Sequence, residues 1–187
     1  MRSYQIYESE HTSHLNGLGY ADMFLDWLTV LIALAALGSG LIAGAFFAFS
    51  TFVMRALARL PADQAIAAMQ SINAEVLKSL FMAVFFGTAA LGAVLGITAA
   101  LRWGEPGMPA LLAGSVLYLA GVLLVTLRGN VPLNIALAAV EAGSPAGAET
   151  WSRYLVSWGR WNHLRTLAAA LACAAFIGAL APLGPGW

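Results

Sequence analysis

Four long stretches without a charged residue constrain this chain more than any other feature of its sequence. They are Trp27–Met54, Ser79–Leu101, Pro106–Leu127 and Thr166–Trp187, each 22 to 28 residues long. A helix needs about 20 residues to cross roughly 30 Å of hydrocarbon, and lipid offers the backbone no other hydrogen-bond partners. Charged residues make up only 10% of the chain, whereas a soluble domain has roughly 25%. The sequence therefore predicts an all-α fold, a polytopic membrane four-helix bundle.

The rest of the chain divides into a tail and the connections between spans. Residues 1–22 are polar and lack an apolar h-region, so we expect a disordered tail and not a cleavable signal peptide. Residues 23–187 are predicted to form one membrane domain, with spans near 27–54, 79–101, 107–127 and 162–183.

Both longer connections are predicted to contain short extra helices. Residues 65–79 have helical composition and are expected to run into the second span. Asn-Val-Pro132 is expected to break the third helix and to begin a short new one. The last helix is expected to begin near Glu149 and to continue unbroken into the fourth span.

The basic residues predict how the chain is oriented. The two longer connections hold Arg55, Arg59, Lys78, Arg128, Arg153, Arg160 and Arg165, whereas the opposite side holds only Arg2 and Arg102. Under the positive-inside rule this asymmetry places both longer connections in the cytoplasm and both termini outside.

The segment WSRYLVSWGRWNHLRT, residues 151–166, carries three of the six tryptophans. At about 100° per residue, one stripe of this helix roughly 100° wide holds Trp151, Tyr154, Trp158, Trp161, Asn162 and Arg165. An aromatic belt at the membrane interface is one interpretation, and it explains Arg153 and Arg160 on the opposite side. The alternative is an inward face, because an amide and a guanidinium near membrane depth should point into the bundle.

Other polar and aromatic side chains recur at helical spacing. Asn130 and Asn134 lie four residues apart in GNVPLN, and Gln70 and Asn73 lie three apart, so each pair can share a helix face. Asn beside Pro and Gly is also common in turns, which is the simpler interpretation for Asn130. The first span contains Phe46, Phe47, Phe49 and Phe52, which are either packing residues or the apolar wall of a pocket for a planar ligand.

Several classes of function are not indicated. We find no His, Cys, Asp or Glu spacing suited to zinc or di-iron, no nucleotide loop and no nucleophile elbow, so no metal site is predicted. Cys173 is expected to be a small core residue. The net charge of zero gives no reason to expect a nucleic-acid partner.

Four segments follow one another along the chain: AGAFFAFSTFVMRALARLP, MQSIN, GNVPLN and a late W-x6-W-x2-WN-x-x-R. In this order they resemble the anthrone oxygenase-like family of four-helix integral membrane proteins. The resemblance covers about residues 28–180, and many members are known only as a domain of unknown function. It implies oxidation of an anthrone to an anthraquinone by molecular oxygen with no cofactor. For a bacterial member it also implies a location in the inner membrane.

That chemistry needs donors for an oxyanion, a base and an apolar cavity. Asn162, Arg165 and Asn134 suit the donors, and Trp158 and Trp161 suit a stacking wall. His163 is the obvious base by residue type, but the helical wheel turns it about 140° away from Trp158. Either the site lies between these two faces, or the base is another group. The further candidates for contact with a substrate are Asn130, Tyr154, Phe47, Gln70 and Asn73.

We therefore expect an oxygenase-like protein whose partners are a planar lipophilic phenol or anthrone and the lipid bilayer. A homo-oligomer is compatible with the sequence. The alternative is a membrane protein that binds or assembles around a lipid or quinone-like ligand without turnover, as the absence of a clear catalytic acid favours.

Overall fold

The computed structural model describes residues 27–181, and every regular element in this range is helical. A first helix covers residues 27–48. It is followed by the π-helix η1 (Phe49–Val53), α2 (Met54–Leu57), α3 (Ala62–Val76), α4 (Leu80–Leu101), α5 (Met108–Val116), the π-helices η2 (Leu117–Leu124) and η3 (Thr126–Asn130), α6 (Val131–Ala138) and α7 (Pro145–Leu180). The tail predicted over residues 1–22 lies outside the described residues.

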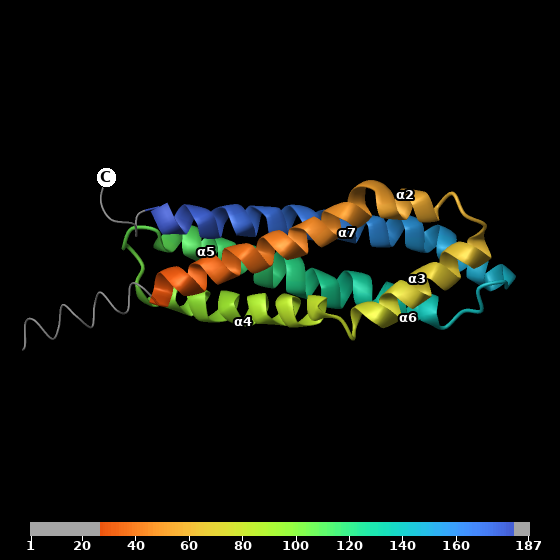
Figure 1. Cartoon of the computed structure of the whole chain (residues 1–187), viewed down its shortest axis with the longest axis horizontal. Helices are drawn as coiled ribbons and strands as arrows, with labels where there is room; N and C mark the ends of the chain where they lie inside the picture. The colour runs from red at the N-terminus through yellow and green to blue at the C-terminus, as the bar shows by residue number, and fades with distance from the viewer. Residues whose placement is uncertain (1–26, 182–187) are drawn as a thin grey trace, which may run out of the picture.

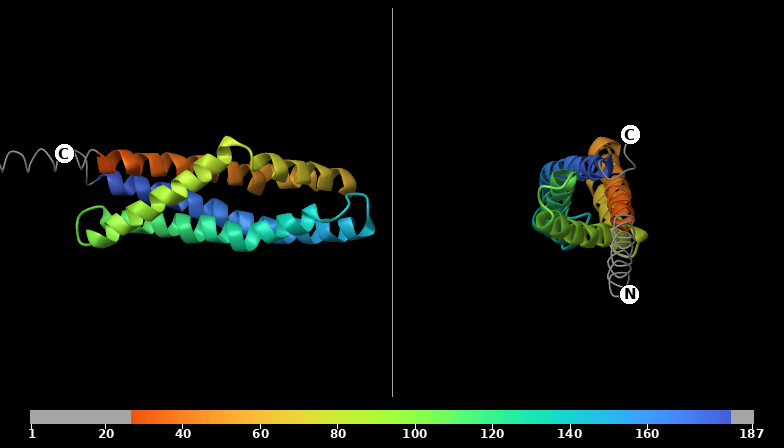
Figure 2. Two further views of the ribbon diagram at one scale, coloured as in Figure 1. Left: turned by 90° about the horizontal axis from the view of Figure 1, so that it is seen from below. Right: turned by 90° about the vertical axis from the view of Figure 1, so that its left-hand side faces the viewer.

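These elements form a bundle of four rods (Figures 1 and 2). Four segments are long and apolar enough to span a membrane: Trp27–Leu57, Leu80–Leu101, Met108–Ala138 and Pro145–Leu180. The rod that contains α4 is continued by α3, and α7 runs the whole length of the bundle (Figure 1). The prediction of an all-α polytopic bundle is confirmed, and α3 is a separate short helix in the first longer connection, whereas α6 continues the third rod.

Two apolar cores divide the bundle along its length. The larger joins the apolar helices and includes Ile32, Leu95 and Phe176. The smaller joins α2, α3, α6 and the first half of α7, and it includes Ile66 and Leu137. The 36 residues of α7 extend about 54 Å, which exceeds the roughly 30 Å of hydrocarbon. The bundle is therefore longer than a membrane is thick.

The prediction that α3 runs into the second span is wrong. The helix ends at Val76, and α4 begins at Leu80 after an extended Ser79 with φ −92° and ψ 162°. The Ser79 hydroxyl donates a hydrogen bond of 2.7 Å to the Val76 carbonyl. Serine competes in this way with the helical ladder, and here it stabilises the break.

The break predicted at Asn-Val-Pro132 is also wrong, because the chain stays helical from η3 into α6. Asn130, at the junction, has φ −87° and ψ −40°. Proline removes one N–H and crowds the carbonyl four residues earlier. The wider π turn of η3 precedes Pro132, and a π turn shifts the hydrogen-bond ladder so that the helix can continue.

The last helix begins at Pro145, four residues before the predicted start near Glu149. The Ser144 hydroxyl accepts a hydrogen bond of 3.0 Å from the Gly147 N–H. Serine at the N-cap followed by proline in the first turn is a strong helix start, so the helix extends back to this pair.

Candidate functional site

The inward stripe of α7 supplies the centre of the site. Its buried members are Trp151, Tyr154, Trp158, Asn162 and Arg165, none of them more than 5% exposed. They recur every three or four residues, so one face of a single helix carries them all. Of the two interpretations of this segment, the inward face holds for these five residues, and the sixth, Trp161, is considered below.

Arg165 is the most unusual residue of this stripe, because it buries a guanidinium in the bundle. Its Nη2 donates to Asn162 Oδ1 at 2.8 Å, and its Nη1 donates to Thr126 Oγ1 at 3.2 Å. The guanidinium carbon lies 4.1 Å from the centre of the Phe46 ring and 5.3 Å from that of Trp158. The cation is therefore held by neutral acceptors and aromatic rings.

No carboxylate in the described part of the chain pairs with Arg165. The ion pairs within residues 27–181 are Lys78–Glu75, Arg102–Glu105 and Arg153–Glu149. The Arg165 Nε is buried without a hydrogen-bond partner. A buried charge normally has a counter-ion, so this arrangement favours a ligand that brings negative charge or an acceptor oxygen.

Asn162 fixes the position of Arg165. Its Nδ2 donates to the Phe46 carbonyl and to Ser50 Oγ, both at 2.8 Å, while its Oδ1 accepts from Arg165. Ser50 Oγ also lies 2.9 Å from Thr166 Oγ1. These bonds join α7 to the first rod at the start of η1. The Asn162 amide is therefore held in place and orients the Arg165 guanidinium.

A second polar cluster surrounds Asn134 of α6. Its Oδ1 accepts from the Tyr154 hydroxyl at 2.8 Å and from Trp158 Nε1 at 2.9 Å. The rings of Trp151, Tyr154 and Trp158 stack in series, with centroids 5.6 and 5.8 Å apart. One amide oxygen thus satisfies two buried aromatic donors and fixes the orientation of the Trp158 ring.

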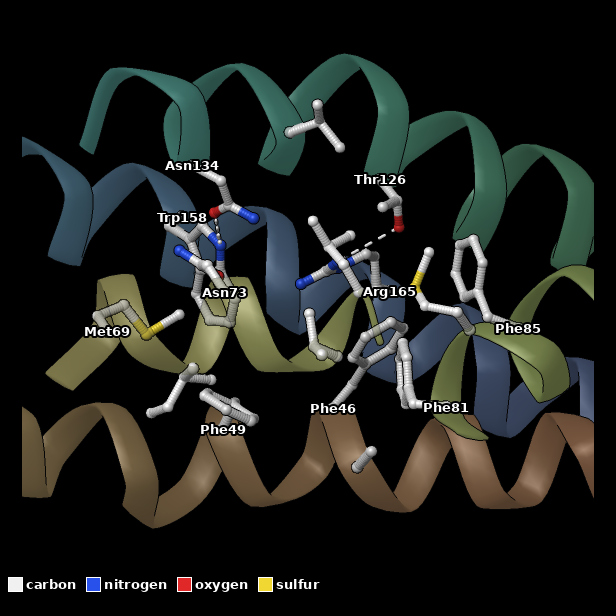
Figure 3. Close-up of a pocket in the computed structure, with 16 residues that line it drawn as sticks. Phe46, Phe49, Met69, Asn73, Phe81, Phe85, Thr126, Asn134, Trp158 and Arg165 are labelled. Carbon is white, nitrogen blue, oxygen red and sulfur yellow. Dashed lines mark hydrogen bonds between the residues drawn. The ribbon is translucent and has the colours of Figure 1, made fainter. Parts of the chain in front are cut away.

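These two clusters border a cavity of about 190 Å³, several times the roughly 30 Å³ of a liquid water molecule. Figure 3 shows Arg165 between Thr126 and Phe46, with Asn134, Trp158 and Asn73 to one side of it and Phe81 and Phe85 to the other. The cavity lies where the two cores meet and is lined by Ala45, Phe46, Phe49, Met69, Ile72, Asn73, Val76, Leu77, Phe81, Met82, Phe85, Thr126, Val131, Asn134, Trp158 and Arg165. It suits a small, mostly apolar molecule that carries oxygen atoms at its edge.

Four of the residues predicted from the sequence line this cavity: Asn73, Asn134, Trp158 and Arg165. Two more, Tyr154 and Asn162, lie directly behind it and hydrogen-bond to lining residues.

The structure places the other five candidates outside the cavity. His163 faces a separate groove, as its position on the helical wheel indicated. Trp161 is 43% exposed, and its ring packs against Gly129. Phe47 is 57% exposed because it lies one residue from the inward Phe46, about 100° around the helix.

Gln70 and Asn130 make bonds to the backbone instead. Gln70 Nε2 donates to the Leu137 and Val140 carbonyls at 2.8 and 3.0 Å, and so caps the end of α6. Asn130 is buried, and its Nδ2 donates to the Trp158 carbonyl at 3.3 Å.

Sequence reasoning missed Thr126, Phe81 and Phe85 as lining residues. Phe81 and Phe85 lie four apart in a uniformly apolar span, where every face has the same composition and no pattern marks the inward one. Thr126 lies at the end of the charge-free run Pro106–Leu127, and no motif or spacing there marks it as a lining residue. The four phenylalanines of the first span did give a signal, and two of them, Phe46 and Phe49, line the cavity.

The described residues contain no group of three or more His, Cys, Asp or Glu side chains that could hold a metal ion. The polar side chains that line the cavity are instead a guanidinium, two amides, an indole and a hydroxyl, and the guanidinium and the amides carry N–H donors. Such groups bind oxygen atoms of a ligand.

The fold and the site together define a helical integral membrane protein that encloses a small aromatic cavity with one buried cation. Residues 81–175, just over half of the chain, match the anthrone oxygenase family. The chain belongs to this family, as its sequence motifs predicted. No match was found among curated proteins or among solved structures.

Proposed function

We propose that this protein is a membrane-embedded, cofactor-independent oxygenase that acts on a planar lipophilic phenol or anthrone. The observation that carries the proposal is the buried Arg165 guanidinium, which has no carboxylate partner among the described residues and lies against an apolar, aromatic cavity. Membership of the anthrone oxygenase family supports the class of reaction.

The chemistry of an anthrone suits such a cavity. Loss of a proton from its methylene gives an aromatic enolate, which can pass electrons directly to molecular oxygen. Overall, the methylene becomes a carbonyl, one atom of the oxygen molecule stays in the product and the other leaves as water. The groups required of the protein are those that hold the ring system and stabilise the oxyanion.

Arg165 is assigned the role of stabilising the oxyanion of the enolate. A cation in a site of low polarity favours the charged enolate over the neutral ketone, because a nearby opposite charge stabilises an ionised group. Phe46 and Trp158 pack against the same guanidinium and would contact the rings of a planar ligand. Asn134 and Asn73 are donors for a second oxygen atom at the far end of the cavity.

The lining residues include no carboxylate, imidazole, thiol or lysine. Proton removal is therefore assigned to solvent, with the enolate stabilised by Arg165. Asn162 acts through Arg165 and is a positioning residue.

The proposal predicts oxygen consumption when the purified protein, in mild detergent, is given an anthrone. After subtraction of spontaneous autoxidation, Arg165→Gln should lower kcat/KM about 100-fold or more, the effect of losing one oxyanion donor. The matched control is Arg160→Gln, which removes an exposed arginine from the same helix and should stay near the wild-type rate. Full activity in Arg165→Gln would contradict the assignment.

The absence of an acid or base from the lining also favours a second candidate, a protein that binds a quinone-like ligand or a lipid without turnover. One experiment, which compares anthrone binding with oxygen uptake, distinguishes the oxygenase from the binding protein. An anthrone that binds and raises the unfolding temperature, with no oxygen uptake above background, would establish the binding protein and exclude the oxygenase.

A further inference from the structure

A second hollow lies on the other side of the contact between the first rod and α7. It is an open groove of about 460 Å³. Met54 and Arg55 line one side, Gly159 and His163 line the other, and Ser50 lies at its base. The cavity described above has its own lining apart from Phe49, so the groove is a separate feature of the surface.

Two local irregularities produce this groove. The π-helix η1 widens the first rod over Phe49–Val53, directly before Arg55. On the facing helix, Gly159 has no side chain, and a Cβ built there would meet nothing within 4 Å. A hollow therefore remains where a larger residue at position 159 would fill it.

The chemistry of the groove favours an anion. Arg55 is exposed, and within residues 27–181 it forms no ion pair. The lining includes no carboxylate, and the His163 imidazole adds a second group that can donate a hydrogen bond. An arginine fork with neighbouring donors is the usual arrangement for a phosphate.

The position of the groove indicates a lipid phosphate in preference to a free one. Arg55 follows directly on the charge-free run Trp27–Met54, which is longer than the hydrocarbon is thick, so Arg55 falls past the end of the hydrocarbon on the side of the headgroups. On α7, Leu167 lies one helical turn beyond His163 towards the apolar half and is 58% exposed. A phosphate held by Arg55 and His163 would thus have apolar surface beside it for an acyl chain.

We propose that the groove between Arg55 and His163 is a binding site for the headgroup phosphate of an anionic phospholipid. This site includes His163, which does not line the cavity. It does not depend on the proposed oxygenase activity, and its test involves no turnover.

The test is titration of the detergent-purified protein with phosphatidylglycerol or phosphatidylcholine, followed by native mass spectrometry. The wild type should retain one phosphatidylglycerol molecule in preference to phosphatidylcholine. Arg55→Gln should weaken this binding about tenfold, the value of a charge-assisted hydrogen bond. Its control is Arg59→Gln, the same change at an exposed arginine one turn further on and outside the groove, which should bind like the wild type.

A second pair of variants tests the shape of the groove without changing charge. Gly159→Leu should fill the groove and lose the lipid, while the helix itself tolerates leucine better than glycine. Gly178→Leu is the control, because it also lies on α7 with open space at its Cβ but outside the groove. Thermal unfolding in detergent checks that each variant is folded.

Three results would overturn the proposal. In the first, Arg55→Gln and Arg59→Gln weaken binding equally, which would indicate diffuse attraction to anionic lipid. In the second, folded Gly159→Leu retains the lipid with wild-type affinity. In the third, inorganic phosphate at the same concentration displaces the phosphatidylglycerol, which would make this a site for free phosphate.

Discussion

Arg165 shows how a membrane protein can keep a charge in its interior for a ligand. Burial of an ion costs several kcal/mol, and each aromatic contact returns about 0.5–2 kcal/mol. The Phe46 and Trp158 rings and two neutral acceptors therefore offset only part of the cost. The positive potential that remains in the cavity is available to an anionic oxygen.

Asn162 and Asn130 are both buried amides, but their bonding differs. Asn162 makes three hydrogen bonds of 2.8 Å, whereas Asn130 donates one of 3.3 Å and leaves its Oδ1 without a partner. Asn162→Ala should lower the free energy of unfolding by about 1–3 kcal/mol, because it leaves buried partners unsatisfied. Denaturation in detergent measures this, and Asn130→Ala should cost less; the reverse order would contradict the bonding described here.

The same pair of variants separates positioning from packing. If Asn162 acts by orienting Arg165, Asn162→Ala should lower the affinity for an anionic ligand, whereas Asn130→Ala should not. Calorimetry with a hydroxyanthraquinone, which is already oxidised and has no methylene to react with oxygen, measures this without turnover. Equal affinities in the two variants would leave Asn162 as a structural residue only.

At the scale of the helices, the irregular backbone gathers around the cavity. The π-helices η1 and η3 and the link between α3 and α4 all come within a few residues of lining side chains: Phe49, Thr126 and Leu77 themselves line it. Irregular backbone at membrane depth is tolerated where it is buried or lines a cavity, and π turns occur frequently at functional sites. These three irregular segments therefore lie at the cavity, whereas η2 contributes no lining residue.

Close contacts between small residues hold the helices together in the apolar half. A Cβ added at Gly121 of η2 would lie 2.5 Å from the Ala168 Cβ of α7, and alanine has no rotamer that could relieve the overlap. Gly121→Ala should therefore force η2 and α7 apart and lower the free energy of unfolding by about 1–3 kcal/mol.

A double-mutant cycle tests whether this loss comes from the contact itself. Adding Ala168→Gly to Gly121→Ala restores the space and should recover much of the lost stability, measured by thermal unfolding in detergent. Additive losses from the two substitutions would show that the helix contact is not the cause.

At the scale of the whole molecule, the bundle has two halves with different surroundings. Three of the four spans run through both halves, and at 31, 31 and 36 residues they are longer than about 30 Å of hydrocarbon, so part of the bundle extends beyond it. The described chain begins and ends at the same end of the bundle, while the longer connections lie towards the other (Figure 1). The cavity lies where the two halves meet.

The excess of basic residues in the longer connections predicts that this extended half lies in the cytoplasm. Single cysteines at Leu60, between α2 and α3, and at Trp103, between α4 and α5, test this in a Cys173→Ala background. Both positions are exposed. An impermeant maleimide added to intact cells should label the Trp103→Cys protein only, and permeabilised cells should show labelling of both. Labelling of both in intact cells would contradict the arrangement, and labelling of Leu60→Cys alone would reverse the orientation.

The periodicity of the sequence was sufficient to find most of the α7 face. Trp158 and Arg165 line the cavity and Asn162 lies behind it, because a single regular helix keeps their angular relation. The prediction was wrong for Trp161 at the edge of the stripe. Its ring packs against Gly129 and stays about half exposed. How much of the α7 stripe is buried depends on how far the neighbouring helix reaches across it. The sequence of α7 alone carries no information about that neighbour.

By itself the sequence determined the four spans, the helical class and the family, because lipid forces apolar backbone into helices and leaves few alternatives. It also identified Arg165 and Asn162 as polar groups that needed burial. Only the tertiary structure decided what they are buried against. The cavity is assembled by residues from all four rods, which are brought together only when the helices pack. Such contacts join residues far apart in the chain, and an apolar span has no pattern that records them.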